Sequence, residues 1–333
     1  MKTGKVLLFF LGLGIIALLF YKIGFTEIEK QFSDLGWKVL YIFLPFFLIG
    51  YIGTWAWIYT FPPPFSKYKI SFSKLFWLRV VGEAVNNFTS TAHVGGDLTR
   101  VLFLKKLGVP TTKGMVAVIM DKVALIITEV FFIFTGILLL LVKMDWPAWV
   151  KGGVASSFLL AGLFIYGILL MVRKGVFSKM SGSLQRRWDW KWLDQIHEKI
   201  KHLDHHLSHF YRHHRREFIS SNVLHYVSWI LGALETWTIL YVLGLRVGLV
   251  DAIMIEALVT LVKGLGFFIV GSLGVLEGGT VFLFQILNIG EGTGLAFTLL
   301  KRAREMAFGA LSWLVFSIQL AGLKPRGTQT LPS

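Results

Sequence analysis

The feature that most constrains the fold is a series of apolar runs, several of which are long enough to cross a lipid bilayer. A helix of about 18 to 20 apolar residues spans the roughly 30 Å hydrocarbon layer. The chain has 333 residues, of which 55% are hydrophobic and 16% charged, and its mean hydropathy is +0.65. Soluble domains carry about 25% charged residues. We therefore expect an all-α polytopic membrane protein.

About six of the runs are expected to form full transmembrane helices. The first run follows a basic N-terminus, as in a signal peptide, but no convincing small-residue cleavage site follows it, so we interpret it as a retained helix. The six ranges are 6–21, 39–60, 116–142, 154–172, 218–243 and 293–321.

Two stretches interrupt this pattern with charges and paired glycines. The first runs from Glu83 to Lys106 and the second from Glu256 to Glu277. Glycines weaken a helix and permit positive φ angles. A helix interrupted at membrane depth leaves backbone groups that protein or water must satisfy. One interruption in each half predicts two re-entrant segments, a probable inverted repeat, and a transport site between the repeats.

The basic residues predict the orientation, because cytoplasmic loops are enriched in Lys and Arg. Segments 61–114 and 173–217 carry nineteen Lys and Arg, whereas loops 22–38, 143–151 and 244–251 carry six. We expect both termini in the cytoplasm, with the first re-entrant segment entering from the cytoplasm and the second from outside.

The whole chain is expected to form a single transmembrane domain. Its parts are a first half (1–172), a basic His-rich cytoplasmic loop (173–217), a second half (218–321) and a short tail (322–333).

Composition excludes several chemistries. The chain has no cysteine, which rules out disulfides, thiolate catalysis and cysteine-ligated metals. Its net charge of +15 follows from the cytoplasmic enrichment of basic residues, so we expect no nucleic-acid partner. We find no phosphate-binding loop, nucleophile elbow or zinc-protease helix. Neither a cofactor nor an enzymatic activity is therefore expected.

The first interrupted stretch supplies five candidate substrate-binding residues. Glu83, Asn86 and Asn87 share one helix face at i, i+3 and i+4. Asp97 and Arg100 are three residues apart and could form an ion pair, or Asp97 could cap the helix that follows the glycine pair.

The second half supplies four more candidates, together with the expected hinge glycines. Lys263 could offset an acid on a neighbouring helix, because buried charges inside a membrane are normally paired or line a cavity. Lys301, Arg302 and Arg304 lie within one turn and would suit an anionic head group, or would balance buried acids. The four candidates are Lys263, Glu277, Arg302 and Arg304; the hinges are Gly95, Gly96, Gly271, Gly274, Gly278 and Gly279. Asp121 and Lys122 are expected to snorkel near the end of their span.

Four histidines, His202, His206, His209 and His213, form one stripe of a helix in the basic loop. This pattern fits a metal site on paper. We favour an amphipathic helix on anionic lipid, and expect no metal.

Several of these motifs resemble a known family. They are Gly82-Glu83-Ala-Val-Asn86-Asn87, Val94-Gly95-Gly96-Asp97, Leu107-Gly108-Val109-Pro110 and Gly271-Ser-Leu-Gly274-Val-Leu-Glu277-Gly278-Gly279. Together they resemble the lysylphosphatidylglycerol-synthase transmembrane (flippase-like) family. Leu231-Gly-Ala-Leu-Glu235-Thr-Trp237 and Arg302-Ala-Arg304-Glu305 look closest to its hopanoid-biosynthesis-associated branch, although Phe88–His93 replaces the Leu-Pro-rich stretch of that branch.

The resemblance implies a bacterial inner-membrane protein related to the lipid-translocating half of multiple peptide resistance factors. We find no stretch in these 333 residues that resembles the aminoacyl-transferase domain of the full-length synthases, so we do not expect the synthase activity. We expect a flippase for a phospholipid, an aminoacyl-lipid or a hopanoid- or isoprenoid-type lipid. Two alternatives stay open, an intramembrane lipid-modifying enzyme and a scaffold that partners lipid-biosynthesis enzymes.

Overall fold

The computed structural model describes residues 14–24, 26, 29, 32, 35–88, 94–143, 146–174, 191–267 and 269–321, and within these ranges it contains helices and no β-strand. The first described helix covers Gly14–Ile23. The later elements are η1 (Gly36–Ile42), α3 (Phe43–Ile58), η2 (Phe65–Tyr68), α4 (Phe72–Phe88), α5 (Gly95–Lys106), α6 (Thr111–Lys143), α7 (Ala148–Lys174), α9 (Lys191–His213), α10 (Arg215–Val242), α11 (Leu249–Leu265), η3 (Val270–Ser272), α12 (Val275–Ile286) and α13 (Glu291–Ala321).

The chain is a polytopic helical membrane protein, as the apolar runs predict. Four helical stretches are long and apolar enough to cross a bilayer, at Gly36–Ile58, Thr111–Lys143, Ala148–Lys174 and Arg215–Val242. Helix α13 has 31 residues and is also long enough, but it carries charges in its first half. The expected first span lies partly outside the described residues, so the total of six spans stays a prediction.

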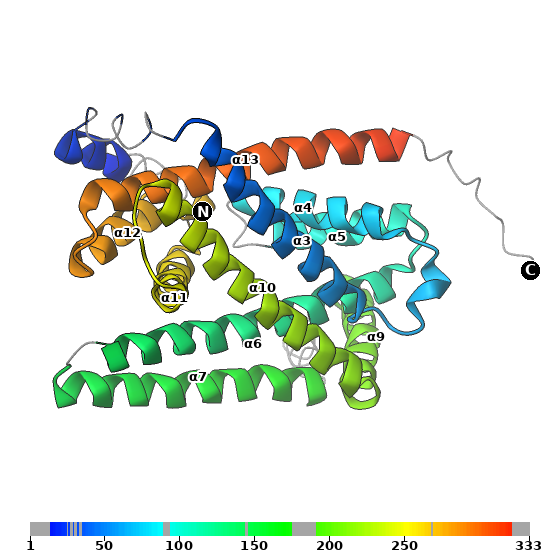
Figure 1. The fold of residues 1–333 in the computed structure, drawn as a ribbon. Coiled ribbons are helices and arrows are strands. Elements are labelled where there is room, and N and C mark those ends of the chain that lie inside the picture. Colours follow the sequence, from blue (N-terminus) through cyan, green and yellow to red (C-terminus); the bar gives the residue numbers. More distant parts are fainter. Residues whose placement is uncertain are drawn as a thin grey trace, which may run out of the picture.

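Helix α9, which belongs to the second basic segment, lies at the same end of the helix bundle as the start of the first basic segment (Figure 1). Leu207 and Phe210 of α9 pack against Val116 at the start of α6, Val172 at the end of α7 and Phe218 at the start of α10. The loop between α3 and α4 lies at this end too. This arrangement agrees with the grouping of loops that we inferred from the basic residues.

Helices α4 and α5 form a hairpin that enters and leaves the bundle at that same end. Leu75 near the start of α4, and Ile70 just before that helix, share one hydrophobic cluster with Leu104 near the end of α5 and Val109 just after it. Both helices are too short to cross a 30 Å core separately. The first interrupted stretch is therefore re-entrant, as expected.

Helices α11 and α12 form a second hairpin, which enters from the opposite end (Figure 1). Met254 near the outer end of α11 and Phe284 near the outer end of α12 share a cluster with Leu240 and Val242 at the end of α10. An ion pair between Lys143 and the α11 residue Asp251 also lies at this end. Two hairpins of opposite entry are what an inverted repeat requires.

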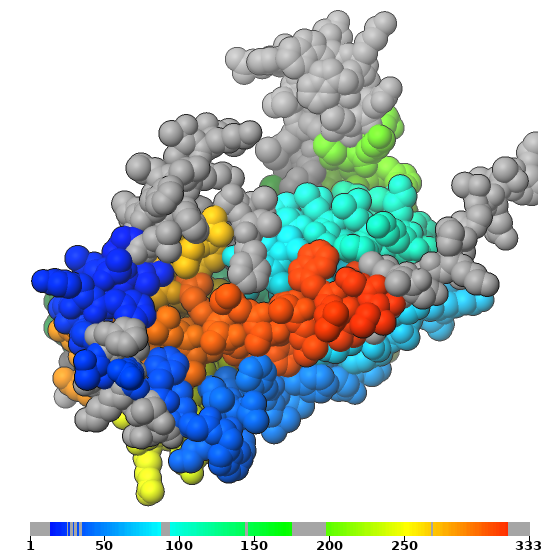
Figure 2. Space-filling view, turned by 90° about the horizontal axis from the view of Figure 1, so that it is seen from above, coloured from blue at the N-terminus to red at the C-terminus, as the bar shows by residue number. Residues whose placement is uncertain are grey.

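Helix α13 connects the two hairpins. It packs against α12 at its start and against α4 farther along. Figure 2 shows α13 crossing one face of the molecule, with α3 along one edge and the region around α5 along the other. Its charged first half therefore lies between the two interrupted stretches.

Candidate functional site

The tips of the two hairpins meet inside the bundle. A Cβ atom built on Gly271, at the tip of the second hairpin, would lie 2.9 Å from the backbone oxygen of Asn87, at the tip of the first, and 3.5 Å from Nη1 of Arg302. Gly271 has φ +55°, a conformation that glycine adopts at little cost. The two interrupted stretches, far apart in the sequence, thus form one contact.

Side chains reinforce this contact through a shared carboxylate. The amide of Asn87 donates a hydrogen bond to Oε2 of Glu305 at 3.4 Å. The other oxygen of Glu305 pairs with Nζ of Lys263 at 3.2 Å. Lys263 is therefore paired with an acid on a neighbouring helix, as the sequence suggested. The acid is Glu305 of α13, which we had not selected as a site residue.

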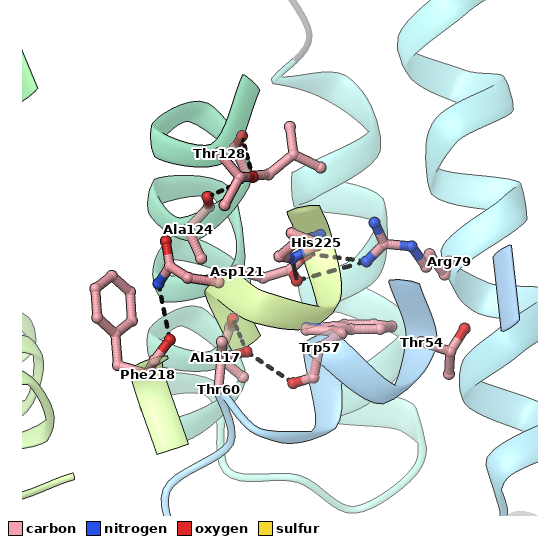
Figure 3. A network of polar contacts seen from close by, with 12 residues as sticks. Thr54, Trp57, Thr60, Arg79, Ala117, Asp121, Ala124, Thr128, Phe218 and His225 are labelled. Carbon is pink, nitrogen blue, oxygen red and sulfur yellow. Dashed lines mark hydrogen bonds and ion pairs between the residues drawn. The ribbon is translucent and has the colours of Figure 1, made fainter. Parts of the chain in front are cut away.

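Asp121 of α6 is the centre of a first charge network, which we call the Asp121 network. Its carboxylate lies 3.1 Å from Nη1 of Arg79, 3.5 Å from Nη1 of Arg100 and 2.9 Å from Nε2 of His225. Figure 3 shows Asp121 between the imidazole of His225 and the guanidinium of Arg79. Asp121 is only 1% exposed, so the expectation that it snorkels is wrong. Two arginines neutralise it instead, which satisfies the requirement that a buried charge be paired.

The remaining charges of this network are Glu83, Asp97 and Lys122, of which Glu83 and Asp97 are predicted site residues. Glu83 lies 3.2 Å from Arg79 and 3.6 Å from Arg100. Asp97 lies 3.7 Å from Arg100 and 3.5 Å from Lys122. The predicted pairing of Asp97 with Arg100 is confirmed. The alternative is wrong, because α5 begins at Gly95 without a side-chain cap and Asp97 lies inside its first turn.

Asn86 joins the two helices of the first hairpin. Its Oδ1 atom accepts a hydrogen bond of 2.7 Å from the backbone nitrogen of Gly96. A Cβ atom on Gly96 would lie 1.9 Å from the backbone oxygen of Gly82, so α4 and α5 are in direct backbone contact here. Asn86 is 7% exposed, and in this structure its amide oxygen holds the hairpin together.

The cations of α13 pair with three different acids. Lys301 contacts Glu256 of α11, and Arg302 contacts Glu277 of α12. Arg304 lies 2.6 Å from Glu235 of α10. The sequence left open whether these cations bind an anionic head group or balance buried acids. In this structure they balance buried acids. With the pair between Lys263 and Glu305, these residues form a second group, the α13 network, that has four acids and four bases.

The predicted hinge glycines fall into two kinds. Gly271 and Gly274 have positive φ angles of +55° and +78° and lie in the break between α11 and α12. Gly278 and Gly279 do not break the backbone, because they lie inside α12. The absence of a side chain at Gly279 instead permits close packing, since a Cβ there would lie 2.4 Å from a methyl of Val262. Gly95 and Gly96 begin α5.

Sequence reasoning missed His225 altogether, because one histidine in an apolar helix gives no pattern. It counted Arg79 only as one of the basic residues of segment 61–114. A signal for both exists only in three dimensions, where they meet on Asp121.

The histidine stripe lies on α9, outside the expected spans. Nδ1 of His206 lies 2.8 Å from the backbone oxygen of His202, and Nδ1 of His213 lies 3.0 Å from that of His209. Burial and the neighbouring imidazoles lower the pKa of His209 below its ordinary 6.5. Among the described residues, no group of three or more His, Asp or Glu side chains is arranged to hold a metal ion.

Comparison with known proteins identifies the family. The model of the lysylphosphatidylglycerol synthase TM region matches residues 5–312. The chain belongs to this family. It is also 22% identical over 336 residues to a UPF0104 membrane protein of Methanothermobacter thermautotrophicus, an alignment that covers 97% of this chain and 96% of the relative. No solved structure matches the chain. The family resemblance is confirmed, and assignment to the hopanoid-associated branch stays a prediction.

Proposed function

We propose that this protein moves a membrane lipid between the leaflets of the bacterial inner membrane, without covalent chemistry and with both termini in the cytoplasm. The observation that carries the proposal is the meeting of two re-entrant hairpins of opposite entry, at Asn87 and Gly271, between two networks of paired buried charges. Membership of a family named for a lipid synthase supports a lipid as the substrate.

The partly exposed charges offer a place for a head group. Glu83, Lys122 and Lys263 keep 39%, 35% and 36% of their side chains exposed, whereas most of their partners are buried. Both lysines lie within electrostatic reach of Glu129 on α6, so they belong to the same region. Two partly exposed cations beside a carboxylate suit an anionic or zwitterionic head group. We infer that Lys122 and Lys263 contact it first.

Alternating access would come from rocking of the hairpins about their tips. In the present structure the charges are closed on one another, and the head group would replace some of these pairs as it passes. The closed pairing explains how eight or more ionised groups can lie at membrane depth, because unpaired charges there are costly. Outside the bilayer, the basic α9 would lie on anionic lipid.

A translocation assay in proteoliposomes with a panel of labelled lipids tests the proposal. Gly271→Ala should slow translocation several-fold, because the new methyl group would push against the Asn87 carbonyl and separate the tips. Gly244→Ala is the matched control: Gly244 also has a positive φ, of +87°, but a Cβ there has nothing within 4 Å. It imposes a similar backbone strain without touching the contact.

Glu83→Gln and Arg302→Ala extend the test to the charge networks, and both should reduce translocation in folded, membrane-inserted protein. If wild-type protein moves no lipid of the panel, the proposal is wrong, and a lipid product in mass spectrometry or a co-purifying enzyme would favour the two alternatives. If lipid moves equally well in Gly271→Ala and Gly244→Ala, the tip contact has no part in transport.

A further inference from the structure

We propose that His225 and Asp121 form a proton-binding site, and that proton uptake there accompanies displacement of the α4–α5 hairpin. This pair joins two helices outside the hairpin, since Asp121 belongs to α6 and His225 to α10. Each residue is 1% exposed, and Nε2 of His225 lies 2.9 Å from Oδ1 of Asp121 (Figure 3). Histidine is the side chain whose ordinary titration range includes neutral pH.

The second oxygen of Asp121 is held by the hairpin. Oδ2 lies 3.1 Å from Arg79 of α4 and 3.5 Å from Arg100 of α5. The carboxylate therefore sits on the boundary between the hairpin and the rest of the bundle. Its two arginine partners come from the hairpin side, and its imidazole partner comes from the other side.

Charge counting shows what displacement of the hairpin would do. With His225 neutral, the Asp121 network balances, because Arg79, Arg100 and Lys122 oppose Glu83, Asp97 and Asp121. Moving the hairpin away removes both arginines from Asp121 at once. A buried carboxylate without a cation is strongly unfavourable. A proton on His225 restores a cation in hydrogen-bond contact with the carboxylate.

The two arginines and the proton are thus alternatives at one carboxylate. Because binding and conformational equilibria are linked reciprocally, a proton that binds better when the hairpin is displaced also favours the displaced state. Acidification should therefore move the hairpin, and holding the hairpin in place should weaken proton binding. If the protein moves lipid as proposed above, a proton gradient would bias that movement.

The ionisable groups that surround His225 support this assignment. Those that act on it most strongly are Asp121, Arg79 and Arg100. Helix α3, which packs along α10, carries only the exposed phenol of Tyr51. Helix α6, also packed on α10, brings Lys113, Lys122, Glu129 and Lys143 besides Asp121. The remaining elements packed on α10 bring Lys38 of η1, Asp204 and His213 of α9, Asp251, Glu256 and Lys263 of α11, and Glu291, Lys301, Arg302, Arg304 and Glu305 of α13. The α13 cations and Lys263 are paired with acids within the α13 network. The acid that directly contacts His225 is Asp121.

The first experiment measures the hairpin directly and needs no lipid movement. Because the chain has no cysteine, spin labels can be placed at Leu102→Cys on α5 and Leu163→Cys on α7, both of which are exposed. In nanodiscs, the distance between the labels should change with pH, with a midpoint between about pH 5 and 8. His225→Gln keeps a hydrogen-bond donor towards Asp121 but cannot take up the proton, so it should abolish the change. His225→Asn is a second non-titrating variant, and His205→Gln, on the exposed face of α9, is the control that should retain the change.

The second experiment imposes a pH gradient across proteoliposomes during lipid translocation. The gradient should change the wild-type rate several-fold and leave the His225→Gln rate unaffected. The proton site is overturned if the label distance in wild type is constant with pH. It is also overturned if the distance in both His225 variants changes with pH as it does in wild type. A pH-dependent distance in a protein that moves no lipid leaves the proton site standing and refutes the proposed transport function instead.

Discussion

Gly96→Ala tests the closest backbone contact in the candidate site. The structure places Gly96 at the start of α5, and a Cβ there would lie 1.9 Å from the backbone oxygen of Gly82 on α4. Real Cβ atoms essentially never lie closer than 3.0 Å to such a neighbour, so α5 would have to move away by about 1.1 Å, the difference between the two distances. A helix backbone cannot yield as the end of a flexible side chain can.

The cost follows from what that movement breaks. The hydrogen bond from the Gly96 nitrogen to Asn86, now 2.7 Å, would lengthen to as much as about 3.8 Å, which is beyond hydrogen-bonding distance. Overpacking costs about 1–3 kcal/mol, and an unsatisfied buried polar group costs about 1–3 kcal/mol more. We expect Gly96→Ala to lower the free energy of unfolding by about 2–6 kcal/mol.

Equilibrium unfolding in mixed micelles with sodium dodecyl sulfate, followed by tryptophan fluorescence, measures this loss. Gly162→Ala on α7 is the matched control, because it lies inside a helix and a Cβ there has nothing within 4 Å. That change should be neutral or stabilise the protein by up to about 1 kcal/mol. If both variants unfold alike, α4 and α5 do not pack as described, and the reasoning on the hairpin is wrong.

Three further predictions test an ion pair, a titrating histidine and the orientation in the membrane. Arg304→Met should cost about 3–5 kcal/mol of stability, because it leaves Glu235 buried and unpaired. Adding Glu235→Leu should recover most of the lost stability. A double variant no more stable than Arg304→Met alone would refute the pairing. In a titration followed by nuclear magnetic resonance, the pKa of His209 should lie below 6.5 and should rise in His213→Gln, because the neighbouring imidazoles disfavour its charged form. Because this pKa is lower in the folded protein, the free energy of unfolding should decrease as the pH falls through 6.5. Single cysteines in place of Lys67 in η2 and Lys201 in α9 should react with an impermeant reagent from one side of the membrane. A single cysteine in place of Lys151, near the start of α7, should react from the other side.

The hairpins were predictable because their signals are local. The paired glycines at Gly95 and Gly96 start a helix, and Gly271 and Gly274 adopt positive φ angles within a few residues of one another. Glycine changes backbone preferences at its own position, so sequence alone shows where a helix breaks. The same reasoning failed at Gly279, where the glycine permits close packing against another helix and leaves the backbone regular.

The partners of the charges were not predictable, because pairing depends on which helices become neighbours. Asp121 and His225 are 104 residues apart, and Asn87 and Glu305 are 218 residues apart. No spacing rule links such positions. Only the general requirement that buried charges be neutralised was available from the sequence, and it predicted that partners exist without identifying them.

The cations of α13 show how compactness in a sequence misleads. Lys301, Arg302 and Arg304 lie within one turn, which suggests a joint site for one anion. Successive residues of an α-helix are rotated by about 100°, so neighbours in sequence point in different directions. Lys301 therefore faces α11, Arg302 faces α12 and Arg304 faces α10, where each meets a different acid. The turn that carries them holds three elements of the second half together, and an anionic head group could engage Arg302 only by displacing Glu277 from it.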